Sequence, residues 1–431
     1  MNFKTRIRVV SFCLVFLLLI LGAFLKKQSE IKALKRQNYN SYSSAVDTLC
    51  NGLYTLHAEL EKASYAATAP MLLRVSAEIN EQSGMALLSL SHLPIEKGET
   101  DELFKLLSQS GDYAMYIAER SASGAPITAD ERKKLIVLSQ IAGDYAYRVD
   151  QMRISFMQTG KLELSLPSSD IPENADCEET EEYPTLIYDG PYSDHILTAE
   201  SKMLSAAQKI SSEKAQSIAA EIMNIKPSTL RFTGETGGKL ASYHFEGEDI
   251  SVSVTQKGGY VLYFRKYRAP AEQKLSVEDA AKRAEEWLES HSGKDFMQSY
   301  YFAEEGVLTV NFAYREGEVT CYTDLIKVGV SLSDGEIVLC EAAGYIMNHS
   351  ERELQLPKNE TAAAELISDN LEIENVRTAL IPSGGNDEIL CYEFLCKNAK
   401  GSEILVYINC ETLLEEQIYI VLKTPGGTLT K

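Results

Sequence analysis

The first feature of the chain is an uninterrupted apolar run near its start. Residues Val9 to Leu25 read VVSFCLVFLLLILGAFL, without a charge. A helix of this length is at the lower limit for crossing about 30 Å of hydrocarbon. It is slightly long for the core of a signal peptide, and Leu21-Gly22-Ala23 is a poor cleavage site. The pattern predicts an uncleaved transmembrane anchor over 9–25 after a short tail over 1–8. A cleaved leader that releases a soluble body is the alternative.

A helical pattern follows the apolar run. Apolar residues three and four positions apart form an a/d seam, which predicts a helix that packs against a partner helix in the same chain or in a second copy. Pro70 interrupts this helix, and further helices are predicted over 71–90, from Thr100 and from Thr128. Thr128-Ala129-Asp130-Glu131 has the spacing of a capping box. We predict an all-α helical bundle domain over 28–158. The seam consists of Val46, Leu49, Leu53, Leu56, Leu60, Ala63 and Ala67.

Two of these helices share a phrase. The segment 107–114 reads LSQSGDYA and the segment 138–146 reads LSQIAGDYA. The match suggests equivalent packing surfaces at which a glycine lets a neighbouring helix come close. The alternative is a ligand site built from the pairs Asp112-Tyr113 and Asp144-Tyr145.

Residues 160–185 interrupt the helical pattern. Seven acids and no base lie between Asp170 and Glu182, which predicts a solvated linker. The next stretch, Tyr183–His195, is punctuated by proline and glycine. Its residues Tyr188, Asp189, Asp194 and His195 could form an acid/base cluster. A single histidine without a nucleophile favours a structural role.

Beyond residue 200 the pattern repeats. Three times a capped helix, beginning near Ser211, Ser276 and Asn359, precedes strands with alternating apolar residues. Alternation is typical of an antiparallel sheet with one face packed against a helix. The repeat predicts three tandem α+β modules over 186–268, 274–348 and 355–425. Glycine-containing hairpin turns separate the strands: Lys257-Gly258-Gly259, Ser333-Asp334-Gly335 and Lys400-Gly401-Ser402.

The strands of the three repeats also align with one another. Segments 242–245, 321–324 and 391–394 are predicted to occupy matching places, each followed by a second strand 17 to 19 residues later. Cys321 to Cys340 and Cys391 to Cys410 are both separated by 19 residues.

Charge and cysteine content limit the function classes. Residues 1–36 hold eight bases and one acid, whereas the remaining 395 residues carry a balance of −27. Such a body excludes nucleic-acid binding by phosphate neutralisation, and the basic head suits an anionic membrane surface. Seven cysteines lie outside the apolar run, without a CxxC pair or a metal-ligand spacing. We expect reduced, buried thiols, which in an exported body would suit an anaerobic source.

No catalytic pattern is present. The chain has no HExxH, GxSxG, P-loop or GxGxxG motif, and its six histidines are scattered. Among 62 acids no pair stands out for glycan hydrolysis, and Trp287, the one tryptophan, is expected in a core. We therefore expect a protein that is not an enzyme, without catalytic residues, cofactor or metal.

Taken together, the apolar segment, the two helical phrases, the stretch Tyr183–His195 and the C-terminal repeats resemble the YpeB family of endospore-forming bacteria. In that family the repeats are PepSY modules. The resemblance implies a non-enzymatic spore germination protein that stabilises, localises or restrains a cortex-lytic enzyme, a SleB-type peptidoglycan hydrolase, at the spore inner membrane. An inhibitor or chaperone of an exported protease, of the PepSY type, is the alternative, and a glycan hydrolase or sensor with an unfamiliar site is a third hypothesis.

The expected partners are that enzyme, the membrane through the N-terminal helix and a second copy through the helical seam, but not nucleic acid. We expect a single-pass protein with its N-terminus inside and its body exported. The flanking charges do not themselves favour this orientation, because five bases follow the apolar run and three precede it.

Overall fold

The computed structural model describes most of the chain, in two compact units. The described residues are 3–95, 97–160, 162, 200–268, 272–293, 295–354, 359–382, 388–424 and 427–430, without the side chains of 3–23, 97–99, 101, 424 and 427–429. Apart from 160 and 162, the predicted linker and the stretch Tyr183–His195 lie outside them. The first unit comprises Met1–Ser64 and Leu72–Glu178, and the second comprises Tyr65–Met71 and Glu179–Lys431.

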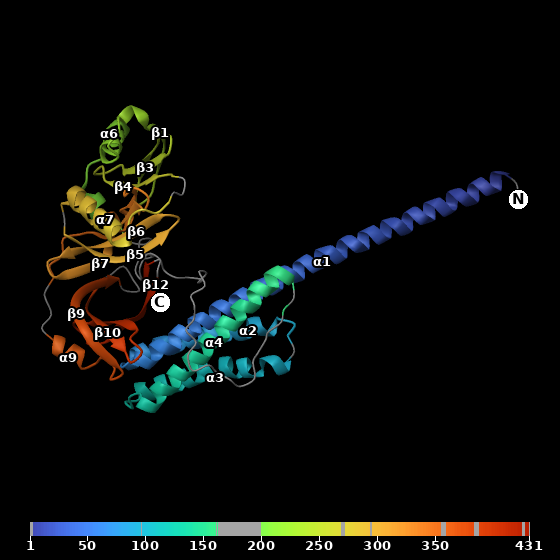
Figure 1. Ribbon diagram of the computed structural model, residues 1–431, viewed down its shortest axis with the longest axis horizontal. Helices are drawn as coiled ribbons and strands as arrows, with labels where there is room; N and C mark the ends of the chain where they lie inside the picture. The colour runs from blue at the N-terminus through green and yellow to red at the C-terminus, as the bar shows by residue number, and fades with distance from the viewer. Residues whose placement is uncertain are drawn as a thin grey trace. The chain divides into compact units, whose positions relative to one another are not determined.

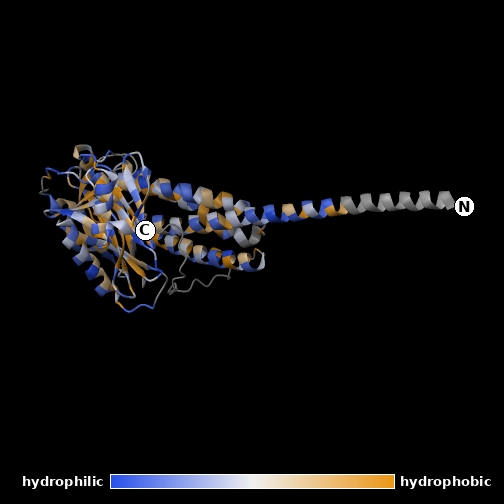
Figure 2. Ribbon diagram, turned by 90° about the horizontal axis from the view of Figure 1, so that it is seen from above, coloured by the Kyte–Doolittle hydropathy of each residue, from blue (hydrophilic) through white to orange (hydrophobic). Residues whose placement is uncertain are grey.

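The first unit is helical, as the periodicity predicts. Its helices carry both hydrophobic and hydrophilic residues, the pattern of helices with one buried face (Figure 2). The break predicted at Pro70 is confirmed, because proline fits only the first turn of a helix. The helices are α1 (Phe3–Tyr65), α2 (Ala69–Ser91), α3 (Lys97–Ala122) and α4 (Ala129–Thr159) (Figure 1).

The predicted seam is buried inside this chain. Val46, Leu49 and Leu53 are fully buried. On the same helix, Tyr39 stacks on Phe156 of α4 with ring centroids 4.9 Å apart. Helix α1 therefore packs along α4, and the seam expected to allow self-association is occupied within one chain.

The start of α4 confirms the predicted capping box. The Thr128 side chain accepts a hydrogen bond from the Glu131 N–H, and the Glu131 carboxylate accepts one from the Thr128 N–H at 2.9 Å. Two N–H groups that the helix leaves unpaired are thereby satisfied. Gly160 ends the helix in the left-handed conformation, with φ 70°.

The predicted anchor falls mostly outside the described side chains. Val9–Leu25 lies within α1, but its side chains are described only from residue 24. Within the described part of the chain, no helix combines the length and apolarity that a membrane crossing requires. The anchor remains a prediction.

In the residues that the structure describes, the second unit is built on one sheet of thirteen strands. The strand order is β1-β2-β3-β4-β8-β7-β6-β5-β13-β12-β11-β10-β9. Neighbours in this order are antiparallel, and hydrogen bonds cross the predicted module boundaries, as where β4 pairs with β8. The strands are β1 (Arg231–Thr236), β2 (Ser242–Glu246), β3 (Ile250–Thr255), β4 (Val261–Lys266), β5 (Phe296–Glu304), β6 (Val307–Glu316), β7 (Val319–Ser331), β8 (Ile337–Glu341), β9 (Leu371–Pro382), β10 (Glu388–Asn398), β11 (Glu403–Asn409), β12 (Glu415–Thr424) and β13 (Gly427–Thr430).

Part of this sheet closes on itself. Besides its antiparallel neighbours, β7 pairs in parallel with β9, where Thr320 lies opposite Ala379. The pairing closes a ring of eight strands in the order β7-β6-β5-β13-β12-β11-β10-β9. Figure 1 shows β9, β10 and β12 curving beside β5–β7. We call this ring the closed sheet.

Two of the predicted helices cover the sheet. Helix α6 (Ser212–Ile222) packs on β2 and β3, and α7 (Val277–Ser292) packs on β5, β6 and β7. Both begin as predicted, because Ser211 and Ser276 cap them through their side chains. One core joins both helices to the sheet, with Ala219, Ala284 and Phe312 among its buried members. Three shorter helices are α5 (Lys202–Ala206), the 3₁₀-helix η2 (Pro227–Thr229) and α8 (Ala343–Asn348).

The third repeat departs from the prediction. Helix α9 spans only Glu360–Ala364, whereas the pattern extends it to Ile367. Its N-cap residue Asn359 makes no side-chain capping hydrogen bond, so this helix lacks the stabilisation that the other two have. The helix-on-sheet pattern is present for α6 and α7, and the count of three modules remains a prediction.

The strand alignment between the repeats was wrong in one respect. In the second and third repeats the aligned segments lie on adjacent strands, β7 with β8 and β10 with β11. In the first repeat they lie on β2 and β4, with β3 paired between them. Equal spacing along the chain therefore does not give equal strand pairing.

Candidate functional site

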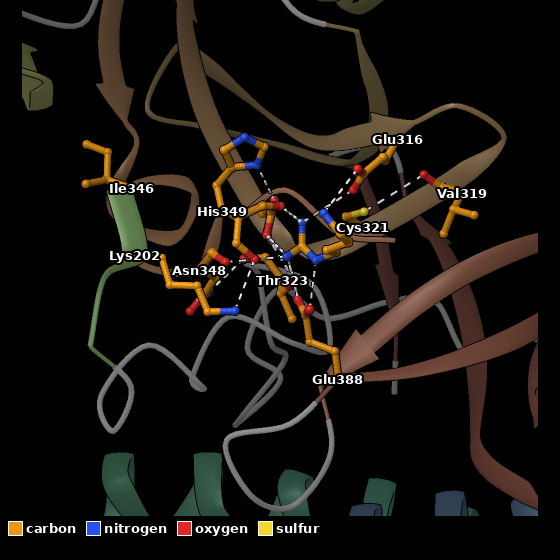
Figure 3. A network of polar contacts seen from close by, with 12 residues as sticks. Lys202, Glu316, Val319, Cys321, Thr323, Ile346, Asn348, His349 and Glu388 are labelled. Atoms are coloured by element: carbon orange, nitrogen blue, oxygen red, sulfur yellow. Dashed lines mark hydrogen bonds and ion pairs between the residues drawn. The ribbon is translucent and has the colours of Figure 1, made fainter. Parts of the chain in front are cut away.

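The most elaborate polar cluster in the second unit surrounds Arg352. This residue follows α8, and only 7% of its side chain is exposed. Figure 3 shows the polar network around it, with Glu316 of β6, Thr323 of β7, Glu388 of β10 and Asn348 at the end of α8. We call this group the Arg352 cluster; it consists of Glu316, Thr323, Asp324, Asn348, His349, Arg352 and Glu388.

Two carboxylates on different strands accept hydrogen bonds from the Arg352 guanidinium. Asp324 on β7 is fully buried, and its two oxygens accept from Arg352 Nη1 at 2.9 Å and Nη2 at 2.8 Å. Glu388 at the start of β10 accepts from Nε at 2.8 Å and from Nη2 at 2.6 Å. Such two-pronged pairs are the strongest ion pairs that arginine forms. The cluster thus links β7, β10 and the segment after α8.

Neighbouring groups fix these carboxylates in place. His349 Nδ1 lies 2.8 Å from Asp324 Oδ2. The Thr323 hydroxyl donates to Glu388, and the Asn348 side chain donates to the Thr323 carbonyl at 2.7 Å. Nearly every polar group in the cluster therefore already has a partner inside the protein.

The electrostatics of the cluster do not favour catalysis. Burial lowers the pKa of Arg352, but hydrogen bonds with Glu388 and Asp324 outweigh it and hold this pKa above its ordinary value. Burial also raises the pKa of the nearby Cys321 thiol to about 12, which leaves it protonated and a poor nucleophile. The arrangement is that of a structural ion network.

Sequence reasoning missed this cluster. Arg352, Asp324 and Glu388 are far apart in the chain and match no motif. One signal was available: Asp324 lies between the apolar pairs Cys321-Tyr322 and Leu325-Ile326 of a predicted strand, where a buried charge requires a partner. The sequence does not identify that partner.

An aromatic hollow lies beside α7. Trp287 packs edge-on against Phe264 and stacks on His291, with centroids 5.8 and 4.5 Å apart. Trp287 and His291 border two hollows of about 490 and 480 Å³; the first also reaches Phe296 and Tyr345, and the second reaches Phe264. Trp287 is thus only partly in the core.

The repeated helical phrase confirms close packing at both glycines. A Cβ on Gly111 would lie 2.7 Å from the Asn80 side chain, and one on Gly143 would lie 3.2 Å from the His57 ring. Both copies of the phrase therefore pack closely at their glycine, but against different neighbours, Asn80 for Gly111 and His57 for Gly143.

The two Asp-Tyr pairs of the phrase have different described surroundings. Asp112 and Tyr113 border a hollow of about 670 Å³ between α3 and α4. Tyr145 instead donates to Glu102 at 3.4 Å. The alternative of a ligand site built from both pairs is not supported.

Other candidates from the sequence are dispersed or lie outside the description. The cluster proposed around His195 falls among residues that are not described. In the described ranges, no group of three or more histidine, cysteine or acidic residues could hold a metal ion. The six described cysteines are free and buried, which confirms the expected thiols: Cys50, Cys321, Cys340, Cys391, Cys396 and Cys410.

Comparison with known proteins matches both units. The family model for the YpeB N-terminal domain matches residues 30–161. The model for the YpeB sporulation PepSY1 and PepSY2 domains matches residues 176–355. The chain belongs to the YpeB sporulation protein family. The second match ends just after Arg352, so the Arg352 cluster joins the PepSY region to the strands that follow it.

Relatives in this family match almost end to end. The sporulation protein YpeB of Halalkalibacterium halodurans is 25% identical over 422 residues, covering 91% of this chain and 92% of its own. That of Bacillus subtilis is 24% identical over 427 residues, with 91% and 92% covered. The solved C-terminal domain of Bacillus megaterium YpeB covers 50% of this chain and 100% of its own, with 24% identity and a TM-score of 0.45. The two family models and the sporulation proteins named above confirm the YpeB resemblance seen in the sequence.

Proposed function

We propose that this YpeB-family protein is a non-catalytic germination protein. It stabilises, localises or restrains a SleB-type cortex-lytic enzyme at the spore inner membrane. The observation that carries the proposal is the family match, which spans the helical and the PepSY regions. Its relatives are named sporulation proteins.

A role without catalysis accords with the chemistry of the second unit. The buried charges of Arg352 and Asp324 are used in an internal ion pair. Thiols such as Cys321 are held protonated by burial. These groups stabilise the contacts between strands and are therefore not available for catalysis, which accords with a protein that acts by binding.

The membrane anchor is part of the proposal. Val9–Leu25 would span the bilayer with its basic flanks at the surfaces, the N-terminus inside and the body exported. Helix α1 runs unbroken from Phe3 to Tyr65, so the same helix that spans the bilayer would enter the helical bundle.

The buried thiols determine how this topology is tested. The described native cysteines are inaccessible, so Lys400→Cys, in the exposed turn after β10, supplies a reactive thiol. Because Cys177 lies in the predicted solvated linker, both chains in this test carry Cys177→Ser. A membrane-impermeant maleimide should label the chain that also carries Lys400→Cys in intact cells and leave the chain with Cys177→Ser alone unlabelled. Labelling only after lysis would place the body inside and refute the proposed topology.

The free edge of the sheet offers a surface for the partner. Strand β1 pairs with β2 alone in the described sheet, and Phe232 on it is 48% exposed. An unpaired strand edge can accept a strand from another protein. We propose that the lytic enzyme docks at β1.

The test uses the full-length chain in detergent with a purified SleB-type enzyme. We expect a complex that Phe232→Ser weakens and Tyr267→Ser, a matched change at another exposed aromatic residue, leaves intact. The chain alone should release no soluble muropeptides from cortex peptidoglycan. Release of muropeptides, or capture of an exported protease in place of the lytic enzyme, would overturn the proposal, and the second result would favour a protease inhibitor.

A further inference from the structure

The interior of the closed sheet is partly polar. Ala313, Tyr322, Ile381 and Tyr407 belong to the core that fills it. Arg377 and Glu393 face the same interior, because each lies two residues along its strand from a member of that core, Ala379 and Cys391. Rings of eight strands are just wide enough to be filled by side chains or to hold one small ligand.

Arg377 and Glu393 form an ion pair across β9 and β10. They are direct partners in the strand register, and Arg377 Nε donates to Glu393 Oε1 at 2.6 Å. Arg377 Nη2 also donates to the Tyr322 hydroxyl at 2.9 Å. Among the described residues, the one hydrogen-bond acceptor of Arg377 Nη1 is the weak acceptor Met297 Sδ, at 3.6 Å. One N–H group of the guanidinium is therefore free for a better acceptor.

Two side chains in this region lack partners for buried polar atoms. Glu393 is 2% exposed, and its Oε2 has no hydrogen-bond partner among the residues described. Asn311 is fully buried on β6, and neither its Oδ1 nor its Nδ2 is paired within that set. Asn311 lies on the same face of β6 as Ala313, toward the interior of the closed sheet. Buried polar atoms without partners are rare and point to something that binds them.

A cavity adjoins Glu393. It has a volume of about 170 Å³ and is lined by Ser299, Tyr300, Arg377, Glu393 and Leu405 among others. The hydroxyl of Ser299, one of these lining residues, donates to the main-chain carbonyl of Asn311 at 3.1 Å. The Arg377 side chain is 38% exposed, which gives the cavity access to solvent.

We propose that this cavity binds a small zwitterion of amino-acid size. The ammonium group of the ligand donates to Glu393 Oε2, and its carboxylate accepts from Arg377 Nη1. The positive charge of Arg377 would repel a simple cation, and the negative charge of Glu393 would repel a simple anion. A zwitterion can pair with both residues. The space equals that of about six waters, enough for a molecule such as alanine. This inference is independent of the proposed partner.

The test titrates alanine against the full-length chain in detergent, followed by calorimetry and by the fluorescence of Trp287 during thermal unfolding. We expect saturable binding and a rise in the unfolding temperature. Ethylammonium and propionate, which each lack one of the two charged groups, should bind at least about tenfold more weakly. Equal binding of all three compounds, or no saturable binding of alanine, would overturn the proposal.

Two matched variants locate the site. Glu393→Gln keeps the side-chain shape but removes the charge, so alanine binding should fall at least about tenfold. Glu374→Gln removes a carboxylate from an exposed pair with Lys397 on the same strands and should leave binding unchanged. Equal affinities in the two variants would refute the assignment. Because the analogue series uses the parent protein, the proposal stays testable even where Glu393→Gln does not fold.

Discussion

The Arg352 cluster allows a quantitative prediction. Arg352→Met keeps most of the side-chain volume but leaves Asp324, which is fully buried, and Glu388 without their guanidinium partner. Removing one member of a buried ion pair costs about 3–5 kcal/mol, because the remaining charge stays desolvated. For a unit of this size, we expect the unfolding temperature to fall by about 6–20 °C. Arg352→Lys keeps the charge but cannot form the paired contacts, so its loss should be intermediate.

The measurement is thermal unfolding followed by tryptophan fluorescence. Trp287 is the one tryptophan of the chain and lies in α7, so the signal reports on the sheet unit. The matched control is Arg268→Met, which removes ion pairs with Asp334 and Glu336 at a side chain that is 40% exposed. Exposed pairs contribute no more than about 1 kcal/mol. Equal shifts in the two Met variants would refute the view that burial makes the Arg352 cluster important.

Three further predictions concern packing, capping and thiols. Gly111→Ala should destabilise the helical unit by about 1–3 kcal/mol, because the added Cβ would meet Asn80. Gly84→Ala, which has open space around it, should stabilise the same unit by up to about 1 kcal/mol. Thermal melts followed by circular dichroism compare the two variants. Ser276→Ala should cost the sheet unit about 1 kcal/mol, and Asn359→Ala almost nothing, in denaturant titrations, because only the first side chain caps its helix. Burial raises the pKa of five described thiols to about 12, so these thiols stay protonated and unreactive at pH 8. Mass mapping after treatment with a thiol reagent should find them modified only in denaturant. Modification in the native protein would contradict their burial.

Local features of the fold could be predicted from the sequence. The helix start at Thr128 and the break at Pro70 follow from capping and from the missing N–H of proline, which act within a few residues. The hairpin turns were also correct, since Gly258 and Gly335 adopt the positive φ angles that such turns require. Alternation along strands such as β3 then identified the sheet.

Features that depend on distant pairing could not be predicted. The parallel contact of β7 with β9 closes a ring from residues about sixty positions apart, and no local pattern encodes it. The partners of Asp324 that neutralise and hold it, Arg352 and His349, both come from the segment after α8. The short α9 was missed because its apolar residues continue the helical pattern although its cap is absent.

Closure of the sheet has a consequence for the order of folding. Strand β13 pairs with β5 through Gly427 and Thr428, opposite Phe302 and Tyr301. The last strand of the ring to be synthesised therefore pairs with a strand made some 125 positions earlier. Loops of that length close slowly. During synthesis β5 must wait with one edge unpaired until almost all of this sequence has emerged, and a chaperone or a partner that covers that edge in the interval would protect the nascent protein from aggregation.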